Sequence, residues 1–231
     1  MLARDWYYTQ RRRVGLDTAV ASIYDNREDN DARARQALTM LGVKPGWRIA
    51  DIGCGNGVLA TEAALMGADV DAIDISPAML GLAEIYARDR KARIRTQPAG
   101  LLSFAYQPNS YDLIVSEFTL HHLPDFWKAV ALSRIFNALK PGANFYLRDM
   151  VFVSMPDGVD RDVEGWADFS IKNHDFERES VMNHMRDEYS TFGWVMERML
   201  TETGFTLVAA DYHAPLHGTY LLRKPKPDEQ I

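Results

Sequence analysis

The chain has a single cysteine, Cys54, among its 231 residues. One thiol cannot close an intrachain disulfide, and such scarcity is typical of proteins from reducing compartments. No uninterrupted apolar stretch approaches the roughly 20 residues that a membrane-spanning helix needs. The first residues, Met-Leu-Ala-Arg-Asp-Trp, lack the basic start and apolar core of a signal peptide. We therefore expect a cytoplasmic protein without a membrane partner.

Positive charge is also in short supply, because 26 lysines and arginines face 32 aspartates and glutamates, for a formal net charge of −6. Proteins that bind nucleic acid neutralise its phosphates with a basic surface, so the negative net charge argues against a nucleic-acid partner. The arginines at 11–13 are more typical of a solvated helix face. The six histidines show neither H-E-x-x-H nor paired-cysteine spacing, so we expect no metal site.

The residues that are present suit a globular chain with one well-buried core, since 47% are hydrophobic and 25% are charged. Apolar segments of strand length alternate with segments of helical periodicity, which is typical of a parallel sheet with helices on both faces. The expected helices cover 1–41 (with polar breaks near 25–26 and 30–31), 57–66, 77–88 and a stretch from 124 to a closing turn, Lys140-Pro141-Gly142. The expected strands are 47–51, 69–74, 93–96, 111–116, 143–149, 205–211 and 217–222.

The most informative segment is an apolar strand that ends in an acid and runs into three alternate glycines, Gly53, Gly55 and Gly57. A glycine turn between a strand and a helix lets the backbone approach a ligand where a Cβ would collide, and the helix N-terminus adds unpaired N–H groups. A dinucleotide-binding fingerprint would place its third glycine, or an alanine, at position 58, where this chain has Val58. The spacing therefore implies no pyrophosphate ligand.

The pattern D-x-G-x-G-x-G in residues 51–57 resembles motif I of the S-adenosylmethionine-dependent methyltransferases of the Rossmann-like class. Later segments are similar to the same family: the acid Asp74 that ends the second strand, SPAML at 76–80, FAYQPNSYD at 104–112, SEFTLHHL at 116–123 and LKPG at 139–142. Upstream, AVASIYD at 19–25 resembles the A-x-x-Y-D of small-molecule methyltransferases. The resemblance implies an α/β, Rossmann-like fold with a seven-stranded, mostly parallel sheet, and S-adenosyl-L-methionine as cofactor with S-adenosyl-L-homocysteine as product.

The resemblance also implies roles for individual residues. Asp74 would accept hydrogen bonds from both ribose hydroxyls, Asp51 would lie near the methionine amino group, and the glycine loop would receive the methionine carboxylate. Many family members carry an acid near position 98 for adenine, whereas this chain has Pro98, so backbone and apolar contacts would hold the base. The expected cofactor-binding residues are Tyr24, Asp51, Gly53, Cys54, Gly55, Gly57, Asp74, Ile75, Met79, Ala99, Gly100, Ser116, Glu117 and Phe118. Among them, Cys54 is a tolerated small residue rather than a nucleophile.

His121 and His122 are the candidate catalytic residues, since they follow the fourth strand and an imidazole titrates near neutral pH, which suits proton removal. Alternatively, one packs on the sheet and the other supports the turn before Pro124. Arg148 and Asp149 are expected to point toward the same opening, to bind a charged substrate or to form a salt bridge with a lid. Further substrate candidates are Tyr7, Tyr8 and Tyr189; simple packing of a terminal helix is the alternative for the first two.

Residues 155–190 differ in character, with ten acids against four lysines and arginines and with several aromatic and methionine residues. A long insertion after the fifth strand has room for a lid over the carboxyl edge of the sheet, although a solvated acidic excursion is the alternative. The expected organisation is a helical segment over the site at 1–41, a core at 42–154 and 191–224, a lid at 155–190 and a flexible tail at 225–231.

These features favour methyl transfer to an oxygen, nitrogen or carbon of a small molecule by in-line displacement at a sulfonium, which needs positioning and exclusion of water. One alternative is an S-adenosylmethionine-binding enzyme of other chemistry. Another is a non-catalytic regulator that binds the cofactor. A homodimer is left open.

Overall fold

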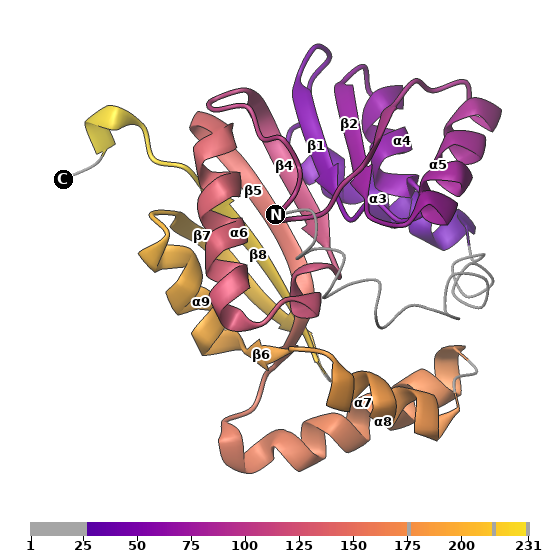
Figure 1. Ribbon diagram of the computed structural model, residues 1–231, viewed down its shortest axis with the longest axis vertical. Coiled ribbons are helices and arrows are strands. Elements are labelled where there is room, and N and C mark those ends of the chain that lie inside the picture. Colours follow the sequence, from indigo (N-terminus) through magenta and orange to yellow (C-terminus); the bar gives the residue numbers. More distant parts are fainter. Residues whose placement is uncertain (1–26, 175–176, 214–215, 230–231) are drawn as a thin grey trace.

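One open sheet, with strand order β3-β2-β1-β4-β5-β8-β7, runs through the molecule (Figure 1). The computed structural model of the chain describes residues 27–174, 177–213 and 216–229. Strands β1 to β5 pair in parallel, whereas β8 runs antiparallel between β5 and β7, and the short β6 pairs with β5 outside this order. The strands are β1 Arg48–Ile52, β2 Asp69–Asp74, β3 Arg95–Pro98, β4 Tyr111–Glu117, β5 Leu139–Phe152, β6 Thr191–Phe192, β7 Thr206–His213 and β8 His217–Arg223.

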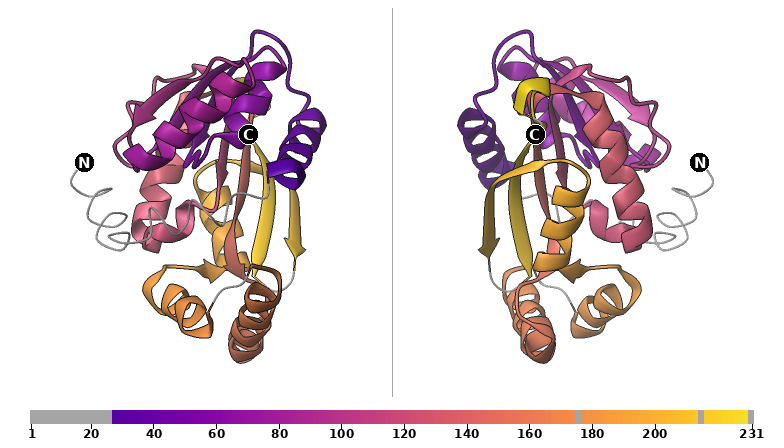
Figure 2. Two further views of the ribbon diagram at one scale, coloured as in Figure 1. Left: turned by 90° about the vertical axis from the view of Figure 1, so that its right-hand side faces the viewer. Right: turned by 90° about the vertical axis from the view of Figure 1, so that its left-hand side faces the viewer.

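Helices cover the two faces of this sheet, and Figure 2 shows α3 and α6 on opposite sides of it. One layer buries Leu38 and Leu59 against Ile49, and the other buries Leu132 against Ile114. Each such side chain contributes about 1.5–3 kcal/mol when it is fully buried, so the two apolar layers fix the sheet between the helices. The first layer is α3 Arg27–Met40, α4 Val58–Leu65 and α5 Pro77–Asp89; the second is α6 Asp125–Ala138 and α9 Gly193–Glu202.

Capping residues set where these helices begin. The Ser76 hydroxyl accepts a hydrogen bond from the Met79 N–H at 3.4 Å, and Pro77 occupies the first turn of α5. Proline suits that position because its missing N–H would have no helical partner there. Gly57, with φ of +78°, stands before α4, and Gly67, with φ of +88°, follows it. These serine, proline and glycine residues thus set the conformation of the loops after β1 and β2, which face the candidate site.

Every expected strand is present, and the fifth is longer than expected. The sequence predicted 143–149 after a turn at 140–142, whereas β5 begins at Leu139, which pairs with Tyr111. A register shift then separates that pair from the pairing of Leu113 with Asn144, so the turn residues form an irregularity inside the strand.

The expected helix break at 30–31 is wrong, because α3 runs through it. Asp31 instead accepts hydrogen bonds from the Tyr86 hydroxyl and from Arg90 on α5. Asp31, which the sequence pattern suggested as a helix break, instead joins α3 to α5.

Ion pairs dock α3, which has few apolar side chains to bury. The carboxylate of Glu62 on α4 accepts hydrogen bonds from Arg35 of α3 at 2.9 Å and from Arg90 of α5 at 2.6 Å. Glu62 is almost fully buried, so its charge is stable only while these arginines stay in place.

Two helices, α7 Val159–His174 and α8 Arg178–Asp187, follow a short 3₁₀ turn at Pro156–Gly158. They lie beyond the carboxyl end of β5, away from the two main helix layers (Figure 1). Trp166 of α7 and Val181 of α8 pack with Met150 of β5 and with Leu216. The aromatic and apolar residues that set 155–190 apart in the sequence therefore include side chains buried at this end of the sheet.

We predict that Glu62→Gln lowers the free energy of unfolding by roughly 2–4 kcal/mol. The substitution removes the buried negative charge that pairs with Arg35 and Arg90, so both arginines lose their ion pair with this position. Chemical denaturation monitored by circular dichroism measures the change. Glu202→Gln is the matched control, since Glu202 forms an exposed pair with Arg198 on α9 and its loss costs no more than about 0.5 kcal/mol. Equal effects of the two variants would contradict the role of Glu62.

Candidate functional site

The candidate site lies at the carboxyl edge of the sheet, where β1, β2, β4 and β5 end side by side. In open parallel sheets this edge is where ligands bind, because the loops there splay apart. Acidic residues lie at or next to the ends of three of these strands: Asp51 in β1, Asp74 in β2 and Glu117 in β4.

The three glycines after β1 all have left-handed backbones, with φ of +78°, +53° and +78° at Gly53, Gly55 and Gly57. A Cβ on Gly53 would fall 1.9 Å from the Thr119 hydroxyl oxygen, and one on Gly57 would fall 2.6 Å from the Ala83 Cβ. At Gly55 a Cβ would meet no protein atom within 4 Å. Internal packing therefore requires two of the glycines, whereas Gly55 presents bare backbone to open space.

The side chain of Cys54 lies inside this turn and is buried. Burial, with the nearby charges of Asp51 and Asp74, raises the pKa of its thiol well above the ordinary value. The thiolate is the reactive form of cysteine, so this environment disfavours Cys54 as a nucleophile.

Asp74 holds the glycine turn in place from the end of β2. One carboxylate oxygen accepts a hydrogen bond from the Gly55 N–H at 3.0 Å, and the other accepts one from the Ser76 N–H at 2.9 Å. The backbone carbonyl of Asp74 also accepts a hydrogen bond, from the Ala99 N–H at 3.1 Å. The residues expected to hold a nucleoside thus converge on one strand end.

The remaining residues expected around the adenine lie in the same region. Met79 is buried at the start of α5, and Ile75 beside it is partly exposed. The Gly100 N–H donates to the Ser103 hydroxyl at 2.9 Å, which shapes the loop after β3. Ser116 has a structural contact, since its hydroxyl donates to the Ile52 carbonyl at 2.9 Å and ties β4 to β1.

Asp51 is the most unusual group at this edge. Its side chain is buried, and its Oδ2 has no hydrogen-bond partner in the described part of the chain. Burial, together with the negative charges of Glu117 and Asp74, raises the pKa of Asp51 to about 8, against the opposing charge of Arg33. A buried carboxyl without a partner is costly unless a ligand satisfies it, and the surrounding acids favour a cationic group.

Arg33 of α3 lies at this edge, although it was not among the residues expected there. Its guanidinium donates two hydrogen bonds to the two carboxylate oxygens of Glu117, at 2.8 and 2.9 Å. This bidentate pair fixes Glu117 beside Asp51. No motif marks Arg33, because its partner is 84 residues away and only the docking of α3 brings them together.

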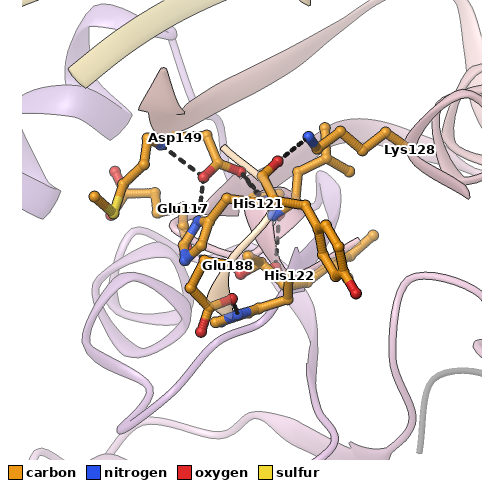
Figure 3. A network of polar contacts seen from close by, with 12 residues as sticks. Glu117, His121, His122, Lys128, Asp149 and Glu188 are labelled. Atoms are coloured by element: carbon orange, nitrogen blue, oxygen red, sulfur yellow. Dashed lines mark hydrogen bonds and ion pairs between the residues drawn. The ribbon is translucent and has the colours of Figure 1, made fainter. Parts of the chain in front are cut away.

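His121 and His122 form a 3₁₀ turn after β4, and each imidazole is oriented by a different carboxylate (Figure 3). The Nδ1 of His121 lies 2.5 Å from Asp149, and the Nδ1 of His122 lies 2.7 Å from Glu188, which follows α8. The two ring centroids are 4.2 Å apart. With Glu188 they bring ligand-type atoms within 4.8 Å of one another, although both Nδ1 atoms already contact carboxylates.

Asp149 is fully buried and has several hydrogen-bond donors. It accepts hydrogen bonds from the backbone N–H groups of Leu120 at 2.6 Å, His121 at 3.2 Å and Met150 at 2.7 Å. Burial opposes its ionisation, but the charge of His121 and the hydrogen bonds from His121 and Met150 hold the pKa of Asp149 below its ordinary value. The ionised carboxylate therefore orients the His121 ring.

The expectation that Arg148 and Asp149 point toward the same opening is wrong. Side chains alternate along a strand, so Asp149 faces the His turn while Arg148 lies on the other face of β5, with its guanidinium 4.9 Å from the Phe118 ring centroid. Neither residue forms an ion pair with α7 or α8 within the described residues.

Tyr189 contributes its backbone to the site. Its N–H donates to the His121 carbonyl at 2.8 Å, and its own carbonyl accepts a hydrogen bond from Lys128 of α6. Lys128 is fully buried and also bonds Asp125 at 2.7 Å. Of the other candidates, Tyr7, Tyr8 and Tyr24 lie outside the described residues.

Comparison with known proteins fits this geometry, since residues 49–142 match a family model described as a methyltransferase domain. This segment is therefore similar to methyltransferase domains. The chain is 33% identical over 105 residues to a ubiquinone biosynthesis O-methyltransferase of Xanthomonas campestris, covering 45% of this chain and 43% of that protein. It is 30% identical over 148 residues to a 27-O-demethylrifamycin SV methyltransferase of Amycolatopsis mediterranei, covering 59% and 54%. The chain therefore spans about half the length of the curated relatives it matches.

Solved structures share the fold of this chain at low sequence identity. The Haemonchus contortus phosphoethanolamine N-methyltransferase 2, in complex with S-adenosyl-L-methionine, superposes with a TM-score of 0.71 at 19% identity, over 96% of this chain and 60% of that one. The [4+2]-cyclase SpnF superposes with a TM-score of 0.66 at 15% identity, over 85% and 81%. No helix in the described part of the chain combines the length and apolar character needed to cross a bilayer.

The residues at the carboxyl edge fit the cofactor of this family, S-adenosyl-L-methionine. The unpartnered Oδ2 of Asp51 suits an ammonium group, and the open space at Gly55 admits a ligand against bare backbone. Both features belong to the loop that the family model covers.

We predict that binding of S-adenosyl-L-homocysteine strengthens as the pH rises from 6 toward 8, by as much as roughly tenfold per pH unit, and then levels off. The reason is that free Asp51, with its pKa raised to about 8, must lose a proton before it can pair with an ammonium group. Calorimetry in buffers of different ionisation enthalpy measures both the affinity and the proton release.

Asp51→Asn is the control for this titration, because it leaves only the ligand's own amino group to ionise. The wild-type protein should release more protons than the variant at pH 7. Identical pH profiles would show that Asp51 does not face the ligand.

Proposed function

We propose that the chain is an S-adenosylmethionine-dependent methyltransferase that acts on a small-molecule acceptor. The observation that supports this most is the buried Asp51 carboxyl, whose Oδ2 has no hydrogen-bond partner in the described part of the chain, next to the open backbone of Gly55 and within the segment that matches the family. Relatives at 30% identity or more are named as ubiquinone biosynthesis O-methyltransferases, a 27-O-demethylrifamycin SV methyltransferase and a phosphoethanolamine N-methyltransferase, which supports a small acceptor.

Four parts of the edge would hold the cofactor. Asp51 and Glu117 would receive the ammonium group, and the glycine loop with the N-terminus of α4 would receive the carboxylate. Asp74 would hold the ribose, and the surface formed by Ile75, Met79, Ala99 and Gly100 would hold the adenine. When bound, S-adenosyl-L-methionine supplies a methyl group on a sulfonium, which is already activated for transfer. The protein then needs to position the acceptor, exclude water and accept a proton where the acceptor carries one.

His121 is the proposed proton acceptor. In the neutral ring, a proton on Nδ1 faces Asp149, so the lone pair is on Nε2. The ionised Asp149 also stabilises the imidazolium that forms when Nε2 takes up a proton. His122 and Glu188 repeat the same arrangement one residue later, with a carboxylate from the segment after α8.

The segment at 155–190 is proposed as the lid over the acceptor. Its helices pack on Met150 and Leu216 at the carboxyl end of the sheet, and its last residues bond to the His turn. Exclusion of water there would favour transfer of a methyl group over side reactions. We also propose a cytoplasmic location, in agreement with the single reduced cysteine.

Another chemistry on the same cofactor is the main alternative, because a fold of this kind also occurs in a [4+2]-cyclase. Incubation with methyl-labelled cofactor and a panel of phenols, amines and carboxylic acids, followed by mass spectrometry, separates the two. Methyl transfer predicts a labelled acceptor that is heavier by one methylene unit. Tight binding of the cofactor without any labelled product would instead favour the regulator or the other chemistry.

We predict that Asp74→Ala weakens binding of S-adenosyl-L-homocysteine by at least roughly a hundredfold, because two hydrogen bonds to a charged group, worth about 1.5–3 kcal/mol each, are lost. Calorimetry measures the affinity. Asp69→Ala is the control on the same strand, since Asp69 pairs with Arg95 at the opposite, exposed end of β2. Equal affinities of the two variants would remove Asp74 from the ribose-binding role.

We predict that His121→Gln and Asp149→Asn each lower the rate of methyl transfer to a hydroxyl acceptor by about 10²–10⁴-fold, because each removes the oriented proton acceptor. Their affinity for S-adenosyl-L-homocysteine should stay within a few-fold of wild type. Steady-state kinetics with an acceptor identified by the panel gives the rates. Full activity of both variants would exclude His121 as the base.

A further inference from the structure

Arg148 is placed on β5 directly beside the cofactor edge. It pairs with Glu117 of β4 on one side and with Thr219 of β8 on the other. Its carbonyl accepts a hydrogen bond from the Phe118 N–H at 2.7 Å, and its guanidinium stacks over the Phe118 ring at 4.9 Å. One face of the planar cation is therefore covered, and its N–H edge is left for other partners.

The charge of Arg148 has no counter-ion in the described part of the chain. Glu117, the nearest acid in register, is already bound through both oxygens to Arg33. Asp149 is engaged with the His turn on the opposite face of the strand. An arginine keeps its charge at any physiological pH, so a half-buried cation remains unneutralised here.

Of the charged neighbours, Glu117 attracts the guanidinium of Arg148 without forming an ion pair with it, and Arg33 repels it. His217 stacks edge-on against Phe118, with ring centroids 5.2 Å apart. Burial and the charge of Arg148 lower the pKa of His217 to about 4, so its ring is neutral. Burial, in turn, lowers the pKa of Arg148 itself. Such an arrangement costs stability unless a ligand provides the missing anion.

The chemistry around Arg148 is apolar on the side of the proposed lid. Phe118 packs against the cluster of Met150, Trp166 and Val181, which joins β5 to α7 and α8. A ligand bound here would place one anionic group on the guanidinium and an apolar body against these side chains. Three acids of α7 have other partners, since Glu164 and Asp168 pair with Arg178 and Asp162 accepts a hydrogen bond from Ser154.

We propose that Arg148 binds a carboxylate or phosphate group of the methyl acceptor, so that the acceptor is a small molecule with an apolar body and one anionic group. This inference rests on the proposed function, because it assigns the substrate class of the same site. A guanidinium group can donate two parallel hydrogen bonds to a carboxylate or to a phosphate. The Phe118 ring stacked beneath the guanidinium of Arg148 fixes the plane in which these N–H groups lie.

Calorimetry on the protein loaded with S-adenosyl-L-homocysteine tests the proposal, with benzoate and phenyl phosphate as anionic probes and benzamide as the neutral match. We expect at least one anion to bind and benzamide to bind at least tenfold more weakly. Arg148→Met should reduce anion affinity at least tenfold, and Arg148→Lys should retain part of it because the charge stays. The ratio of benzoate to phenyl phosphate affinity distinguishes a carboxylate from a phosphate acceptor.

The affinity for S-adenosyl-L-homocysteine separates this proposal from the proposed function. It should stay within threefold of wild type in Arg148→Met, because Arg148 serves the acceptor. A large loss would assign Arg148 to the cofactor and overturn the inference, as would equal binding of benzoate and benzamide, anion affinity that Arg148→Met leaves unchanged, or no anion bound by the loaded protein. Failure of the wild-type protein to bind the cofactor product would instead contradict the proposed function.

The midpoint temperature of thermal unfolding, Tm, distinguishes a ligand-binding arginine from a structural one. Arg148→Met should leave the Tm of the ligand-free protein unchanged or raise it, since an unneutralised charge is removed. Arg33→Met is the matched control and should lower the Tm, because it leaves Glu117 buried without its bidentate partner. A fall in Tm for Arg148→Met as large as that for Arg33→Met would show a structural role and overturn the proposal.

Discussion

Repulsion between acids at one edge of a parallel sheet is the constraint on which the rest of this site depends. Parallel strands end at the same edge, so Asp51, Asp74 and Glu117 are necessarily close together. Arg33 pairs with Glu117 among them, and α3, which carries Arg33, is docked by ion pairs to Glu62 rather than by a large apolar face. The proposed cofactor site and the docking of a polar helix are thus linked through this bidentate contact. The remaining imbalance suits a ligand that brings its own positive charge.

Local patterns made much of the fold predictable. Alternation of strands and helices, the Ser76-Pro77 helix start and the glycine turn each depend on residues close in sequence, and each is present. The pairing of Arg33 with Glu117 depends on where a helix docks, which no short motif encodes. Arg148 and Asp149 were expected to face one opening, but neighbouring residues of a strand point to opposite faces, so only Asp149 contacts the His turn. The strand ends that carry these acids could be predicted from the sequence, but their electrostatics could not.

The fold leaves the chemistry open, since a cyclase and an N-methyltransferase both superpose on this chain. The chemistry of the site therefore depends on particular side chains. Two imidazoles oriented by two carboxylates give one edge of the site a capacity for proton transfer, and an unneutralised guanidinium on the other face of β5 gives a capacity for anion recognition. These two capacities lie on either side of the end of β4, where a methyl group and its acceptor would meet.

Lys128 has a mechanical consequence for this arrangement. Its ammonium has no access to water and is shared between Asp125 at the start of α6 and the carbonyl of Tyr189 after α8. A charge shielded in this way cannot exchange one partner at a time, because each intermediate would be an ion without solvation. With the Tyr189 N–H donated to the His121 carbonyl, this ammonium ties residues 188–191 both to α6 and to the turn that bears the imidazoles. A movement of the proposed lid would therefore also displace the proposed proton acceptor.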